Sequence, residues 1–61
     1  MTAKEALQKI SDSINEKRNE VYKEIAFANS HNFQLEATAL RYKTDAYSDI
    51  NAEILMLLHS L

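Results

Sequence analysis

The chain has 61 residues, no cysteine, and seven lysines and arginines against nine aspartates and glutamates, which gives a formal net charge of −2. A chain of this length forms one domain at most, and because it lacks cysteine for disulfides or thiolate metal sites, we expect self-association to supply the missing stability. There is neither the basic excess typical of nucleic-acid binding nor a strong acidic excess, and no apolar stretch approaches the roughly 20 residues of a membrane span, so we expect a cytoplasmic protein.

The sequence also contains no glycine and no proline, the residues that most often form tight turns. Their absence predicts a few long helices. Thr2 and Glu5 have the spacing of an N-terminal capping box, so the first helix is expected over residues 3–28. Its apolar stripe advances in three- and four-residue steps with a break at Arg18: Leu7, Ile10, Ile14, Val21, Ile25 and Ala28.

A polar cluster without helical periodicity, residues 29–32, lies almost at the middle of the chain and predicts a bend. Asn29 is expected to take the left-handed conformation that ends the first helix, and Ser30 or Asn32 to cap the next one. The second helix is then expected over residues 33–60. Its apolar stripe consists of Phe33, Ala37, Leu40, Tyr47, Ile54, Leu58 and Leu61.

These elements predict an all-α fold, an antiparallel two-helix hairpin forming a single domain. With the bend at residues 29–32, residues whose numbers add up to about 61 face each other, such as Val21 and Leu40. The same register places Arg18 beside Lys43 and Thr44, a polar layer between two apolar halves. Either both basic side chains extend to water and pack only their stems, or Arg18 determines the register or the choice of partner.

The second helix carries a further apolar row beside the stripe that faces the first helix. Its alanines would allow close backbone approach, so we expect this row to join two protomers into a symmetric dimer shaped as a four-helix bundle. The alternative is a tilted hairpin that uses both rows internally. The expected dimer-interface residues are Leu35, Ala39, Tyr42, Ala46, Ile50 and Leu57.

Other apolar and acidic side chains should point away from both interfaces. We consider them a candidate surface for a partner protein: Phe27, Leu55, Met56, Glu16, Glu20 and Glu24. The acidic residues recur every fourth position and could meet a basic surface, or they could simply keep one helix face solvated. The exposed apolar residues could equally be scattered surface positions or, less in keeping with the charges nearby, part of a membrane-surface helix.

The sequence offers no recognisable reaction chemistry. Without glycine there is no phosphate-binding loop, dinucleotide fingerprint or nucleophile elbow. His31 and His59 have no second histidine or carboxylate at a spacing that completes a metal site. No catalytic, cofactor-binding or metal-binding residue is therefore expected, and we do not expect an enzyme.

The leading functional hypothesis is a small regulatory or adaptor protein that acts through protein–protein contacts. A second hypothesis is an RNA-binding regulator of Rop-like architecture, a dimer of short helical hairpins; it would need a basic stripe, which Lys4, Lys23, Arg41 and Lys43 do not obviously form. A third is a purely structural oligomer.

The whole chain, which begins Met1, Thr2, Ala3, Lys4, Glu5, also resembles the small helical proteins encoded in the early region of lambda-like phages, between the exonuclease and excisionase genes. The resemblance rests on size, on the absence of glycine, proline and cysteine, and on the general run of the sequence. It implies a role in phage development, biasing lysis against lysogeny or altering host replication through contacts with a host or phage protein. No motif accompanies it, so no functional residue carries over.

Overall fold

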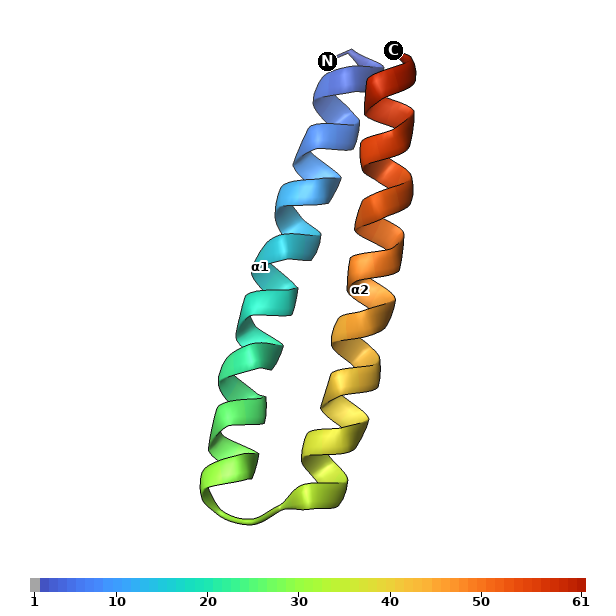
Figure 1. Cartoon of the computed structure of the whole chain (residues 1–61). Helices are drawn as coiled ribbons and strands as arrows, with labels where there is room; N and C mark the ends of the chain where they lie inside the picture. Colours follow the sequence, from blue (N-terminus) through green and yellow to red (C-terminus); the bar gives the residue numbers. More distant parts are fainter. Residues whose placement is uncertain (1) are drawn as a thin grey trace.

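The computed structural model describes residues 2–61 as two long antiparallel helices joined by a short turn (Figure 1). Helix α1 spans Ala3–Ser30 and helix α2 spans Gln34–Ser60, and the described residues contain no strand. The start of α1 lies beside the end of α2, and the turn lies at the opposite end of a rod 45 Å long. The predicted all-helical hairpin is confirmed.

Thr2 caps the N-terminus of α1. Its Oγ1 accepts a hydrogen bond from the Glu5 backbone N–H at 3.2 Å, which satisfies one of the free donors of the first turn. The Glu5 carboxylate, 3.3 Å from Oγ1, accepts from the Thr2 hydroxyl and does not return to the Thr2 backbone as a full capping box would require. One of the two hydrogen bonds of the predicted capping box therefore forms, the one from the Glu5 N–H to the Thr2 side chain.

The turn begins two residues later than the sequence predicts. Asn29 remains helical, and the left-handed residue is Asn32, with φ of 60°. The Asn32 N–H bonds the Asn29 carbonyl at 3.2 Å and the Phe33 N–H bonds the Ala28 carbonyl at 2.8 Å, the pair of hydrogen bonds of a Schellman motif. Phe33 occupies the N-cap position of α2 without a side-chain cap, so neither Ser30 nor Asn32 has the capping role predicted for it.

The two helices meet along a seam of buried and half-buried side chains whose spacing alternates between three and four residues. This is the seven-residue repeat of an antiparallel coiled coil. In α1 the seam consists of Leu7, Ser11, Ile14, Arg18, Val21, Ile25 and Ala28, and in α2 of Ala37, Leu40, Thr44, Tyr47, Asn51, Ile54 and Leu58.

The later turn shifts the register of the hairpin by about one helical turn from the prediction. The Arg18 guanidinium reaches Ser48 of α2, five residues beyond Lys43, the residue that the predicted register places beside it. Ser11 is buried where the sequence favours Ile10, whose side chain is 50% exposed. Phe33 and Leu61, predicted for the α2 stripe, are exposed as well. Polar residues thus occupy seam positions that a purely apolar stripe leaves out.

Candidate interaction surfaces

A chain of hydrogen bonds crosses the middle of the seam. The Ser11 hydroxyl donates to Asn51 Oδ1, and Asn51 Nδ2 donates to Asn15 Oδ1 at 3.4 Å. Arg18 donates from Nη2 to Asn15 Oδ1 at 2.9 Å and from Nη1 to the Ser48 hydroxyl at 3.1 Å. Three of these hydrogen bonds join α1 to α2. The side chains of the network hydrogen-bond mainly to one another.

Arg18 packs its stem into the seam, as one of the two predicted interpretations requires, but its head bonds both helices instead of extending freely to water. The buried Nε has no hydrogen-bond partner among the described residues. An unpaired buried donor costs free energy. The Arg18 Nε therefore offsets part of the stabilisation that the other hydrogen bonds of the network provide. The network therefore belongs to the pairing of the two helices.

The predicted apolar stripes identify Arg18 as a polar break but leave out Ser11, Asn15, Ser48 and Asn51, the other members of this network. A signal was present: Ser11 and Arg18 are seven residues apart in α1, and so are Thr44 and Asn51 in α2. All four share one position of the heptad. Polar residues recurring at heptad spacing inside an apolar stripe indicate buried polar layers.

The six predicted interface residues lie on the outer side of α2, and all are exposed. Leu35 is 85% exposed, Tyr42 71% and Leu57 55%. The hairpin therefore leaves the row uncovered, and the alternative in which a tilted hairpin packs both rows internally is not the arrangement observed.

Near the C-terminal end of α2 this row contains a hollow lined by Glu53, Met56, Leu57 and Ser60. Met56, predicted for a separate partner surface, lies here beside Leu57 and extends the row. Leu55 is the next residue along the helix and so points about 100° away from Met56. The two residues do not share one patch.

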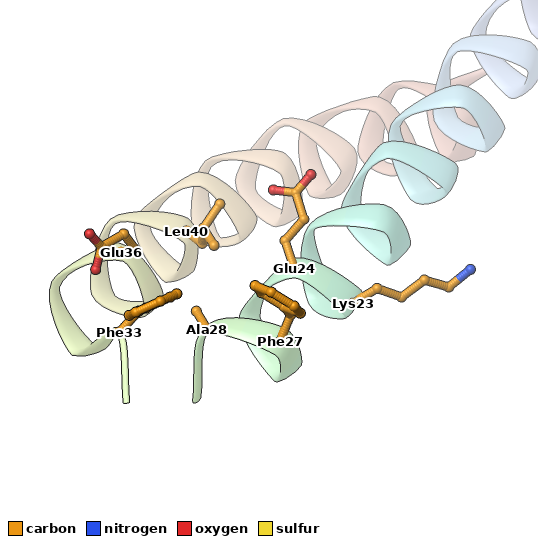
Figure 2. A pocket seen from close by; sticks show the side chains of 7 residues that line it. All are labelled: Lys23, Glu24, Phe27, Ala28, Phe33, Glu36 and Leu40. Carbon is orange, nitrogen blue, oxygen red and sulfur yellow. The ribbon is translucent and has the colours of Figure 1, made fainter. Parts of the chain in front are cut away.

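A second hollow lies at the turn end of the hairpin (Figure 2). Its apolar part comes from both helices: Phe27, Ala28, Phe33 and Leu40. Glu24 of α1 and Glu36 of α2 supply carboxylates at its rim, and the Lys23 side chain extends away from it. The sequence pointed to Phe27 and Glu24, whereas Phe33 and Glu36 join them only because the chain reverses at the turn.

His31 helps to hold the aromatic side of this hollow. Its ring stacks on Phe27 with 4.1 Å between ring centroids and lies 5.7 Å from the ring of Phe33. Its Nδ1 is 2.9 Å from the Phe27 carbonyl oxygen and 3.0 Å from the Ser30 hydroxyl. The imidazole is thus held against the turn, with the rings of Phe27 and Phe33 as its aromatic neighbours.

The predicted partner residues do not form one continuous surface. Phe27 and Glu24 lie at the turn end, whereas Leu55 and Met56 lie at the other end of the rod. Glu16 and Glu20 are exposed on α1 between these ends. The structure therefore divides the candidate surface into a turn-end hollow and the outer row of α2.

Residues 2–61 contain no group of three or more histidine and acidic side chains placed to hold a metal ion. Over the same residues, neither helix combines the length and the apolar character that crossing a membrane requires. Comparisons with family models, with curated proteins and with solved structures found no match to the chain.

Proposed function

We propose that the protein is a small non-enzymatic regulatory or adaptor protein that works as a homodimer and binds another protein through its helical surfaces. The observation that carries the proposal is the contrast between a filled seam and an apolar exterior. Eleven large apolar side chains of the described residues are exposed, whereas Val21 and Ile54 are the large ones that are buried. Exposed apolar surface on this scale is typical of proteins that bind other proteins.

The outer row of α2 is the surface we assign to self-association. A hairpin of this size buries little apolar surface by itself, and pairing two copies through α2 would cover Leu35, Tyr42 and Leu57 at once. The product would be a dimer of four helices in which the two α2 helices lie at the centre. Sedimentation of the purified chain at tens of micromolar tests this step, and a monomer throughout that range would contradict it.

The turn-end hollow is the surface we assign to the partner protein. Its apolar lining with Phe27 and Phe33 suits an apolar side chain, and its carboxylates, Glu24 and Glu36, suit a lysine or arginine close by. A partner segment that places a basic residue next to an apolar one would match both features. If the resemblance to phage early proteins holds, that partner is a host or phage protein.

A capture experiment with matched baits tests the partner surface. Wild-type protein, the Phe27→Ala variant and the Tyr22→Ala variant are used to capture proteins from the same host lysate; Tyr22 is similarly exposed but lies outside the hollow. We expect a protein that wild type and Tyr22→Ala retain and that Phe27→Ala loses, with purified-component binding that weakens as salt is added. Identical recovery by all three baits would contradict this assignment.

The RNA-binding alternative receives no support from the placement of the basic residues at the turn end. Lys23 lines the hollow that contains Phe27, whereas Arg41 lines a different hollow with Asn29 and Thr38. The two hollows share no residue and open on opposite faces of the hairpin. A continuous basic stripe for phosphate contacts would need both residues on one face.

A further inference from the structure

We infer that two copies of the chain pair through α2 in antiparallel orientation, with Leu35 of each copy inserted into the hollow near the C-terminal end of the other. This inference rests on the proposed homodimer and adds its orientation and register. The occupant of the hollow is therefore a second copy of this chain.

The hollow lies between four residues of one helix, Glu53, Met56, Leu57 and Ser60, at positions i, i+3, i+4 and i+7. Any helix surface offers sets of four residues at this spacing, and such a set forms the hole that receives one side chain of a neighbouring helix in knobs-into-holes packing. Here the space between the four side chains is hollowed. The hollow thus has the form of a site for a single apolar knob supplied by another helix.

The knob that fits this hollow is Leu35. Among residues 2–61 it is the most exposed large apolar side chain, at 85%, and it lies in the same outer row. If two α2 helices run antiparallel and Leu35 enters the hole centred between Met56 and Leu57, the two-fold axis passes close to Ala46. The hole and knob of one copy then match the knob and hole of the other, as a symmetric dimer requires.

The rest of the row fits this register. Ala46 faces Ala46 at the axis, where small side chains allow the helices to approach closely. Tyr42 of one copy lies over the turn that contains Asp49 and Ile50 of the other. The exposed side chains of Tyr42 and Ile50 therefore cover each other. The contact therefore runs along α2 from Leu35, past the two-fold axis near Ala46, to the hollow at Met56 and Leu57.

A parallel pairing of the two α2 helices fits the row less well. If the two α2 helices were parallel and in register, Leu35 of one copy would lie beside Leu35 of the other. A hole at that level needs helical residues from the turn before Leu35, but α2 begins at Gln34. Glu53 would also face Glu53 across the contact, an unfavourable pairing of like charges. In the antiparallel pairing Glu53 faces Ala39 instead, one turn from Lys43, whose ammonium can reach the carboxylate.

Disulfide trapping tests the orientation, because the chain has no cysteine of its own. The variants Leu35→Cys and Met56→Cys are oxidised separately and as a mixture, with one of them carrying a tag that changes its mass. We expect a cross-linked heterodimer from the mixture and none from Leu35→Cys alone, since the antiparallel register separates the two copies of residue 35 by roughly 30 Å. Cross-linking of Leu35→Cys to itself, with no heterodimer, would overturn the antiparallel orientation.

Sedimentation of wild type and two charge variants separates failure of this inference from failure of the homodimer. A monomeric wild type contradicts the homodimer itself. A dimer whose dissociation constant rises at least about tenfold in Leu35→Asp but not in Tyr22→Asp supports the inferred contact. Equal dimerisation of Leu35→Asp and wild type would overturn it, and circular dichroism of the exposed-site variants shows whether each has retained its helices.

Discussion

Ser11 of α1 and Asn51 of α2 form the shortest side-chain hydrogen bond between the two helices, 2.5 Å from Oγ to Oδ1, and both residues are buried. Each stands in the seam where an apolar residue would give more hydrophobic stabilisation. Sliding α2 by one turn would separate the pair and leave two polar groups buried without partners, at a cost of about 1–3 kcal/mol for each. The bond therefore favours one register of the hairpin over its neighbours.

Asn51→Ala is expected to lower the free energy of unfolding by about 1–3 kcal/mol, because it leaves the Ser11 hydroxyl buried without its acceptor and opens space in the seam. Urea denaturation followed by circular dichroism, at one fixed protein concentration, measures the change. An unchanged midpoint would mean that Ser11 finds another partner or that water reaches the site.

The double variant Ser11→Ala with Asn51→Leu is the companion experiment. It removes both polar groups together, so we expect it to recover most or all of the stability that Asn51→Ala loses. If the register depends on the Ser11–Asn51 bond, the same variant should show a broader amide NMR spectrum, because adjacent registers become closer in free energy. A spectrum as sharp as that of wild type would contradict this role.

Arg18 provides a second test of the polar seam. Arg18→Met keeps an unbranched side chain against the seam and removes the buried Nε that has no partner, so we expect the free energy of unfolding to stay the same or to rise. Arg18→Ala removes the packed stem as well and should lower it by about 1–2 kcal/mol. A loss in Arg18→Met as large as that in Arg18→Ala would show that the bonds to Asn15 and Ser48 outweigh the buried donor.

The sequence was sufficient for the helices but not for their pairing. Helical periodicity and the polar cluster at residues 29–32 are local signals; the first predicts both helices, and the second predicts the chain reversal to within two residues. The register depends on where the turn is centred. Moving the centre of the turn by two residues changes which α2 residue faces a given α1 residue by about four positions. Ile10 and Ser11 illustrate the consequence: the more apolar residue is half-exposed and the polar one is buried, because the heptad spacing decides which side faces α2.

The two candidate surfaces also differ in how far the sequence alone predicts them. The outer row of α2 could be read from the sequence because all its members lie on one helix. The turn-end hollow could not, because Phe33 and Glu36 reach Phe27 and Glu24 only across the turn. A surface built from two helices requires the register, which the apolar pattern alone did not provide.

The cap of α1 gives a prediction independent of the seam. Thr2→Ala removes the oxygen that accepts from the Glu5 N–H and should lower the free energy of unfolding by about 1 kcal/mol, whereas Thr2→Ser keeps the acceptor and should change it little. Thermal denaturation of the two variants beside wild type measures the difference. Equal midpoints for Thr2→Ala and Thr2→Ser would show that the first turn frays too readily for its cap to matter.

Asn32 and Asn29 test where the chain reverses. Asn32 has φ of 60°, so Asn32→Gly should raise the free energy of unfolding by up to about 1 kcal/mol, and Asn32→Ala should lower it by about 1–2 kcal/mol through the cost of a left-handed Cβ. Asn29 is helical, so Asn29→Gly should instead lower it by about 0.5–1 kcal/mol. Urea denaturation of the three variants distinguishes the two turns: stabilisation by Asn29→Gly together with destabilisation by Asn32→Gly would return the bend to the position that the sequence favours, and with it the register in which Val21 faces Leu40.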